Sequence, residues 1–257
     1  MQNLSSIISE RLLPRVSQPA QYIGLETNAY NKDVESAEVA VAMAFPDSYS
    51  VGISHLGNQI LYHIANNLPG VACDRTYCPL PDAEAVMRSE KIPLFGWESR
   101  RAVGQFDMLA FSIPHEGCLT NVLTMLDLAG VPLRTNQRTE SHPIIIAGDA
   151  VADAPEPMAP FIDLFCVGDG EETFVRLIEL LRQAKQAGAS RQEFILQAAR
   201  SIPAVYAPQY YRPVYNDDGT LKQLCPVEEG LPYYIKRSRI ARLSNSPDLS
   251  NRLVPLT

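Results

Sequence analysis

The chain has 257 residues, 46% of them hydrophobic, and 22 Lys plus Arg against 29 Asp plus Glu give a formal net charge of -7. This length and apolar content suffice for a full hydrophobic core. The acidic balance argues against general nucleic-acid binding and against adsorption to a membrane surface. No apolar run approaches the roughly 20 residues of a membrane span, and the N-terminus lacks the regions of a signal peptide. The sequence therefore predicts a cytoplasmic protein and leaves its oligomeric state open.

The five cysteines form an odd set, at positions 73, 78, 118, 166 and 225. The closest pair, Cys73 and Cys78, has four residues between its members, a spacing typical of neither a zinc site nor a redox motif. We therefore expect reduced, mostly buried thiols and no metal ligands.

The elements follow one another as in an α/β protein. Residues 1–36 are polar and irregular and predict loops that wrap the domain rather than contribute to its core. Five short, mostly apolar runs are typical of parallel strands covered on both faces, at 39–45, 71–77, 107–113, 143–148 and 162–168. Helical patterns lie between or after them, at 54–68, 81–90, 119–130 and 171–188, with a short link at 152–160. This alternation predicts a doubly wound, flavodoxin-like (Rossmann-like) sheet of five parallel strands.

The sequence changes in character after Gly188. One more helical pattern is followed by a proline-marked exit, and Asp218-Gly219 between two strand-like runs predicts a β-hairpin. The basic last stretch reads as a linker towards a further domain. The predicted organisation is a wrapping segment at 1–36, a Rossmann-like domain at 37–188, a helix-plus-hairpin appendage at 189–235 and a linker at 236–257.

The loops after the predicted strands are where a ligand site is expected, because open α/β sheets bind ligands outside the carboxyl ends of their strands. None of these loops reads G-x-G-x-x-G or G-x-x-x-x-G-K-[ST], which disfavours nicotinamide cofactors and nucleoside triphosphates. The turn Gly168-Asp169-Gly170 opens a helix, a geometry that favours anions. Asp169, Glu171 and Glu172 would nevertheless repel a phosphate there, so a bare phosphate cradle is not expected.

Several longer motifs resemble a known family. In chain order they are AFPDSYSVGISHLGNQILYHIAN, WESRRAVGQFDMLAFSI, TNVLTMLDLAGVPLR, IIIAGDAVADAPEPMAPFIDLFCVGDGEE and KRSRIARL. Together they resemble the N-terminal region of a cytoplasmic family of cobalamin-binding-domain radical S-adenosylmethionine (SAM) proteins of unsettled function, over roughly residues 10–245.

The resemblance implies an accessory domain that binds cobalamin or substrate and is not catalytic by itself. Its partner would be a radical SAM barrel, in cis or on a separate chain. Such barrels carry C-x-x-x-C-x-x-C, which holds a [4Fe–4S] cluster beside S-adenosylmethionine, and this sequence contains no such triplet. The resemblance therefore assigns the cluster and S-adenosylmethionine to the barrel and cobalamin to the domain at 37–188.

The resemblance also implies where cobalamin would bind. The corrin would lie over the loops at 46–57 and 114–118, and its nucleotide tail would pass Ser112, Gly148 and the Gly168–Gly170 turn. The cofactor-binding residues expected on this basis are Ser54, His55, Ser112, His115, Gly148, Asp149, Gly168, Asp169, Gly170 and Glu171.

This sequence departs from the usual cobalamin pattern at three places. The motif D-x-H-x-x-G, whose His ligates cobalt, reads G-I-S-H-L-G-N around His55; S-x-L reads S-I-P from Ser112; and a pair of glycines reads Gly148-Asp149. Two alternatives therefore stay open: a degenerate Rossmann-like interaction module, and a stand-alone flavodoxin-like enzyme that uses His115 and Glu116 as an acid–base pair.

Overall fold

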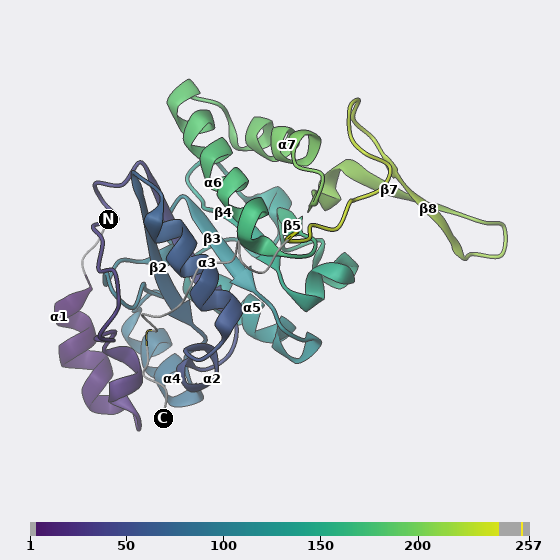
Figure 1. The fold of residues 1–257 in the computed structure, drawn as a ribbon. Coiled ribbons are helices and arrows are strands. Elements are labelled where there is room, and N and C mark those ends of the chain that lie inside the picture. Colours follow the sequence, from purple (N-terminus) through teal and green to yellow (C-terminus); the bar gives the residue numbers. More distant parts are fainter. Residues whose placement is uncertain (1–3, 242–252, 254–257) are drawn as a thin grey trace.

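A central six-stranded sheet organises the molecule, as the computed structural model of residues 4–241 and 253 shows (Figure 1). Its strands are β1 (Val39–Phe45), β2 (Val71–Tyr77), β3 (Met108–Ser112), β4 (Ile144–Gly148), β5 (Leu164–Cys166) and β6 (Val205–Tyr206). Their order is β2-β1-β3-β4-β5-β6; the first five are parallel, and β6 is antiparallel to β5. The predicted α/β class and flavodoxin-like order of the first five strands are confirmed.

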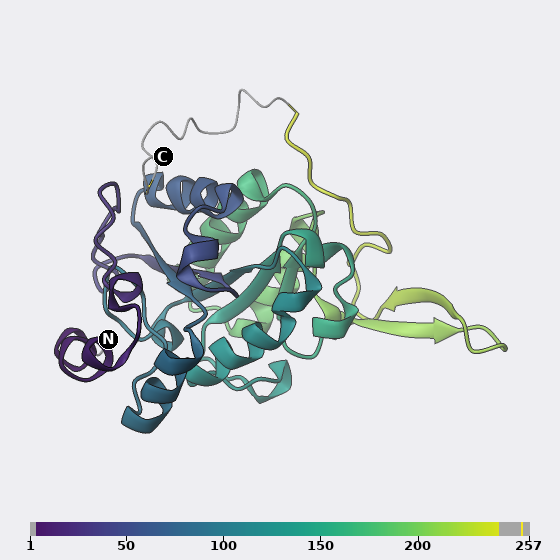
Figure 2. The same cartoon turned by 90° about the horizontal axis from the view of Figure 1, so that it is seen from below.

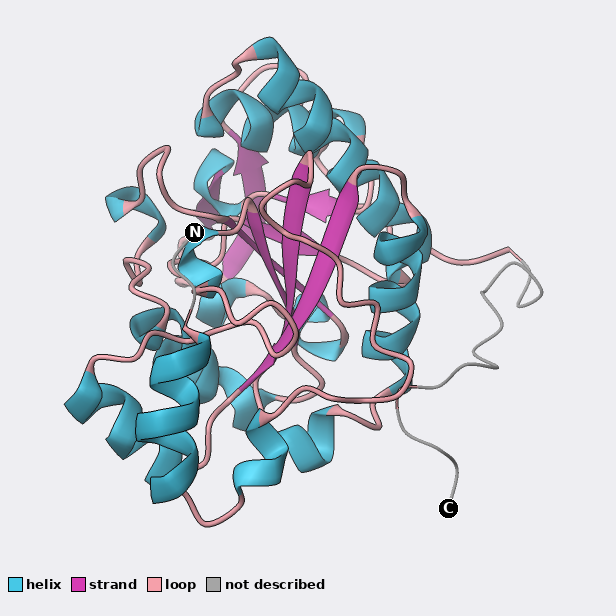
Figure 3. Cartoon of the chain, turned by 90° about the vertical axis from the view of Figure 1, so that its left-hand side faces the viewer, coloured by secondary structure: helices cyan, strands magenta, loops and turns pink. Residues whose placement is uncertain are grey.

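Helices cover both faces of this sheet (Figure 3). They are α2 (Tyr49–Gly52), α3 (Leu56–Asn67), α4 (Pro81–Glu90), α5 (Leu119–Leu128), α6 (Gly170–Ala187) and α7 (Arg191–Ser201). In Figure 2, α3 and α6 lie on one face and α4 and α5 on the other. Strands β1, β2 and β3 are buried along their whole length, which is why β1 and β3 read as nearly continuous apolar runs rather than alternating ones. Strand β2 also buries three polar residues, Asp74, Arg75 and Thr76. Short 3-10 turns complete the connections, at Leu13–Arg15, Pro19–Tyr22, Val103–Gln105, Glu116–Cys118, Thr135–Gln137, Ala150–Asp153, Glu156–Met158 and Pro208–Tyr210.

The sheet has one strand in addition to the five parallel strands that the sequence predicts. The additional strand, β6, consists of only Val205 and Tyr206, which pair with Cys166 and Phe165 of β5. Two residues are too few to show the alternation of a strand.

The prediction that the N-terminal segment stays outside the core was wrong. Helix α1 (Ser5–Ile7) continues into a π-helical turn (Ile8–Leu12), and Leu4, Ile8 and Leu12 are buried in the same hydrophobic core as the sheet. Residues spaced four apart lie on one helical face. The apolar stripe formed by Leu4, Ile8 and Leu12 was therefore present in the sequence but too short to stand out among polar neighbours.

The predicted helix and hairpin after Gly188 are both present. Helix α7 begins at a capping box in which Ser190 and Glu193 bond each other's backbone. Strands β7 (Tyr211–Tyr215) and β8 (Leu221–Pro226) pair only with each other in the described sheets, and they project away from the domain (Figure 1). Of the predicted linker, residues 242–252 and 254–257 lie outside the described part of the chain. No helix of the described residues is long and apolar enough to cross a membrane.

Candidate functional site

A cavity of about 250 Å³ lies at the carboxyl ends of the central strands. Its floor comes from β1, β3, β4 and β5, including Met43 and Ile146, and its walls come from the first turns of α3 and α6, including Leu61 and Phe174. Parallel strands point their carboxyl ends to one edge, and helices that begin there leave space between their N-termini and the sheet. The fold thus produces the cavity at the position that sequence reasoning assigned to a ligand.

Eight of the ten residues predicted to bind a cofactor line this cavity. They are His55, Ser112, Gly148, Asp149, Gly168, Asp169, Gly170 and Glu171. The other two, Ser54 and His115, are not among the lining residues. The Ser54 hydroxyl donates a hydrogen bond to the Val51 carbonyl, and the His115 ring contacts Cys118.

A polar cluster joins three of the lining residues. The Ser112 hydroxyl donates to Asp149 Oδ2 over 3.0 Å, and His55 Nε2 lies 3.6 Å from the same oxygen. In a hydrolytic triad the imidazole stands between the hydroxyl and the carboxylate. Here the carboxylate stands in the middle, so the cluster orients side chains and does not activate Ser112 as a nucleophile.

Asp149 has a backbone conformation that is almost restricted to glycine. Its φ is 74° and its ψ is -163°, a region that costs other residues about 1–3 kcal/mol. Asp149 also stands where the cobalamin pattern has its second glycine. Its Oδ1 accepts a hydrogen bond from the Ala150 amide, which begins the 3-10 turn after β4. Asp149 therefore holds a backbone conformation typical of glycine while its side chain caps this turn.

His55 is held by contacts within the chain on both ring nitrogens. As the N-cap of α3, it accepts a hydrogen bond at Nδ1 from the Asn58 amide over 3.3 Å, while Nε2 faces Asp149. The ring also packs against Phe45, with 5.0 Å between centroids. This arrangement makes His55 a helix cap and a wall of the cavity rather than a free metal ligand.

The glycines around the cavity differ in what they face. A Cβ on Gly168 would lie 2.2 Å from the Ser238 carbonyl oxygen, so the close approach predicted there is made by the chain's own backbone. A Cβ on Gly170 would lie 3.2 Å from Leu61. A Cβ on Gly148 would meet nothing nearer than Cys166, at 3.8 Å, so Gly148 is the one of the three with room beside it.

A strap, defined as residues 236–240, crosses the carboxyl end of β5. The Ser238 amide donates to the Val167 carbonyl, and the Ile240 amide donates to Asp169 Oδ2 over 2.7 Å. Arg237 pairs with Asp153 over 2.6 Å. The strap thus accounts for part of the basic tail and brings cationic side chains near an otherwise acidic rim.

The cavity combines apolar walls with an acidic rim. Asp149, Asp169 and Glu171 contribute carboxyl groups. Burial raises the pKa of the Cys166 thiol, which also lines the cavity, to about 12, so this group stays neutral near pH 7. The carboxyl groups at the rim disfavour an anion in this cavity.

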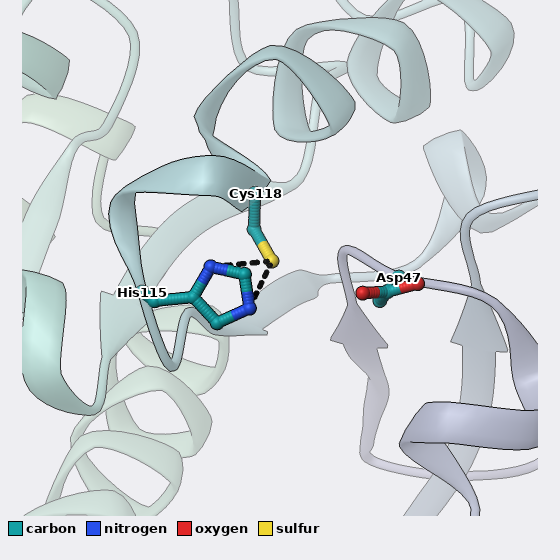
Figure 4. A group of neighbouring side chains, drawn as sticks. All are labelled: Asp47, His115 and Cys118. Atoms are coloured by element: carbon teal, nitrogen blue, oxygen red, sulfur yellow. Dashed lines mark hydrogen bonds between the residues drawn. The ribbon is translucent and has the colours of Figure 1, made fainter.

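A second group of chemically active side chains lies outside the cavity, between the loop after β1 and the turn after β3. It contains Asp47, His115 and Cys118 (Figure 4). His115 was predicted as a cofactor-binding residue, with no connection to Asp47 or Cys118. The signal was the spacing His115-x-x-Cys118, together with Asp47 at the end of a strand predicted to neighbour β3.

One weaker idea from the sequence, an acid–base pair of His115 and Glu116, loses support from these contacts. The His115 ring turns to the Cys118 thiol, at 3.6 and 3.8 Å from its two nitrogens, and Glu116 is exposed. An acid–base pair of His115 and Glu116 is therefore not favoured by the geometry.

The comparison with known families agrees with this architecture. The family described as "Radical SAM proteins, N-terminal" matches residues 57–208, more than half of the chain. The matched range begins in α3 and ends just after β6, so it includes both helices that wall the cavity. The fold and the match define an N-terminal domain of the radical SAM class. The chain belongs to this family of radical SAM N-terminal regions. No curated protein and no solved structure matches it.

Proposed function

We propose that the chain is an accessory domain of a radical SAM protein and that its cavity receives the heteroaromatic base of the cobalamin nucleotide tail. A radical SAM barrel, in cis or on a separate chain, would be its partner. The observation that carries the proposal is the position of the cavity, at the carboxyl ends of β1, β3, β4 and β5, with Gly148 open beside it.

The size and lining of the cavity fit one ring system. Its 250 Å³ lies below the range of about 300–1,000 Å³ typical of sites for whole drug-sized ligands. A corrin ring would therefore have to lie outside, and a flat neutral base would enter. Met43, Ile146 and Phe174 would contact its faces, and Ser112 and Asp149 would supply polar contacts at its edge.

The acidic rim limits how the tail would be held. Asp149, Asp169 and Glu171 disfavour a phosphate inside the cavity. The residues present fit the base and do not offer a cationic pocket for the phosphodiester. Cobalamin, when bound, supplies cobalt chemistry that amino-acid side chains do not provide.

A degenerate interaction module is the second candidate, and two observations favour it. At Gly168 the strap, rather than a ligand, makes the close backbone approach, and Asp149 stands where the cobalamin pattern has its second glycine. Under this alternative the cavity is a remnant, and the domain contributes only surface to its partner.

A cobalamin titration distinguishes the two candidates. Purified chain is mixed with hydroxocobalamin or cob(II)alamin, and the free ligand is measured by ultrafiltration and visible spectroscopy. The proposal expects saturable binding by the wild type and at least a tenfold loss of affinity for Gly148→Val, because the added methyl groups fill the cavity. Ser54→Ala is the matched control, since Ser54 does not line the cavity, and it should bind like the wild type.

His55 needs a separate measurement. Because both ring nitrogens already have partners in the chain, the electron paramagnetic resonance spectrum of bound cob(II)alamin should be the same for His55→Ala and for the wild type. Loss of an axial nitrogen signal in His55→Ala would identify this residue as a cobalt ligand. Wild-type protein that binds no cobalamin would support the interaction module, and unchanged binding by Gly148→Val would place the site elsewhere.

A further inference from the structure

We infer that Asp47, His115 and Cys118 form a binding site for one divalent transition-metal ion, Zn²⁺ in the first instance. The three side chains offer one oxygen, one nitrogen and one sulfur ligand, and these atoms all lie within 4.8 Å of one another (Figure 4). None of the three residues lines the cavity.

The separation of the ligand atoms suits a tetrahedral metal. Cys118 Sγ lies 3.6 Å from His115 Nε2. With Zn–S of about 2.3 Å and Zn–N of about 2.0–2.1 Å, a tetrahedral centre places sulfur and nitrogen about 3.6 Å apart. The sulfur is almost as close to Nδ1, at 3.8 Å, so a rotation of the exposed His115 ring would aim one nitrogen at the ion.

The turn that carries two of the ligands is built to hold them together. The Cys118 amide donates to the His115 carbonyl, which closes a 3-10 turn. Between them, Gly117 leaves room for the imidazole, because a Cβ there would lie 3.0 Å from His115 Nδ1. His115-Glu116-Gly117-Cys118 thus brings an imidazole and a thiol to the same side of one turn.

The third ligand is positioned by the neighbouring strand. Asp47 follows β1, which pairs in parallel with β3, and its Oδ1 accepts a hydrogen bond from the Ser48 amide over 2.6 Å. The described contacts give its other oxygen, Oδ2, no hydrogen bond. The Asn121 side chain donates to the Pro46 carbonyl and so ties this loop to α5. The carboxylate is therefore oriented before any ion arrives.

The chemistry of the ligands points to zinc. A mixed set of thiolate, imidazole and carboxylate suits Zn²⁺, whereas Mg²⁺ and Ca²⁺ prefer oxygen ligands alone. Three protein ligands leave a fourth position for water or a ligand, as in zinc sites that act on substrates.

The site can be tested without cobalamin. The chain is stripped with a chelator and titrated with Co²⁺, which replaces Zn²⁺ and reports thiolate ligation by a charge-transfer band in the near ultraviolet. We expect one equivalent to bind, the band to disappear in Cys118→Ser, and Zn²⁺ to displace Co²⁺ from the wild type. His115→Ala and Asp47→Asn should each lower the affinity at least tenfold.

Matched controls separate metal binding from folding. Cys225→Ser and His142→Ala remove a thiol and an imidazole that are not in the cluster, and both should titrate like the wild type. His115 is exposed, so His115→Ala should keep the circular dichroism spectrum even if the buried Cys118→Ser variant does not fold. A charge-transfer band that survives in Cys118→Ser, or equal affinities for wild type and His115→Ala, would overturn the assignment. These outcomes do not depend on whether the cavity binds cobalamin.

Discussion

Asp149 combines a strained backbone with three side-chain interactions. Its φ of 74° suits glycine, while its carboxylate contacts the Ser112 hydroxyl, the His55 ring and the Ala150 amide. Strain of this kind persists where surrounding contacts hold it, and it occurs often at ligand sites. Substitutions of Asp149 are therefore the most direct test of what holds the rim of the cavity in place.

Two substitutions at this residue separate the strain from the contacts. Asp149→Ala loses the hydrogen bonds and keeps the strain, whereas Asp149→Gly loses the same bonds and relieves it. We expect the glycine variant to be more stable than the alanine variant by about 1–2 kcal/mol, against the usual order of these two residues. Urea denaturation of both variants measures the difference. An alanine variant as stable as the glycine variant would show that the backbone relaxes when the side chain is removed.

Cys166 predicts a pH dependence. Burial raises the pKa of its thiol from 9.0 to about 12, so the folded state holds this proton more tightly than the unfolded state does. The resulting stability is fully present below pH 9 and is lost as the pH rises through about 12, at up to about 1.4 kcal/mol per pH unit. Cys166→Ala should give a shallower fall in the free energy of unfolding between pH 9 and 11. Equal slopes for the two proteins would mean that water reaches the thiol.

The elements of the sheet show what a sequence pattern can and cannot reveal. Strands β1 and β2 and helix α4 begin and end where the patterns predict, because long apolar or amphipathic runs average over many residues. Strand β6 has two residues and takes its conformation from β5, so no local pattern exists for it. The first π-helical turn was missed for a related reason, since a stripe of three apolar residues is weak evidence.

The N-terminal stripe nevertheless contributes to stability. Leu12 is 0% exposed within the core, whereas Leu25, in the same wrapping segment, is 83% exposed. Leu12→Ala should lower the free energy of unfolding by about 2–5 kcal/mol, through lost burial and the cavity left behind. Leu25→Ala, the matched control, should change it by no more than about 0.5 kcal/mol. A small effect at Leu12 would show that the segment is not part of the cooperative unit.

At the scale of the whole molecule, one edge of the sheet collects the chemistry. The cavity, the strap and the Asp47–His115–Cys118 cluster all lie at the carboxyl ends of the strands. The edge itself was predictable from strand order. Which side chains meet there was predictable only in part. The resemblance pointed to eight of the residues that line the cavity. The Asp47–His115–Cys118 cluster also depends on the side-chain orientation of His115, whose ring lies against Cys118, and the sequence does not specify that orientation.

Membership in a radical SAM family raises the question of what this chain does with iron. A [4Fe–4S] cluster needs three or four thiolates that meet, and the sequence lacks C-x-x-x-C-x-x-C. In the described part of the chain, the one group of ligands close enough to share a metal contains a single cysteine, Cys118. Anaerobic reconstitution with iron and sulfide should therefore give no cluster absorbance and no bound sulfide. At most one Fe²⁺ should be retained, and His115→Ala should release it. Bound sulfide in a stoichiometry near that of iron would show that cysteines from separate elements assemble into an iron–sulfur site. Iron that binds without sulfide and persists in His115→Ala would place the ion outside the Asp47–His115–Cys118 site.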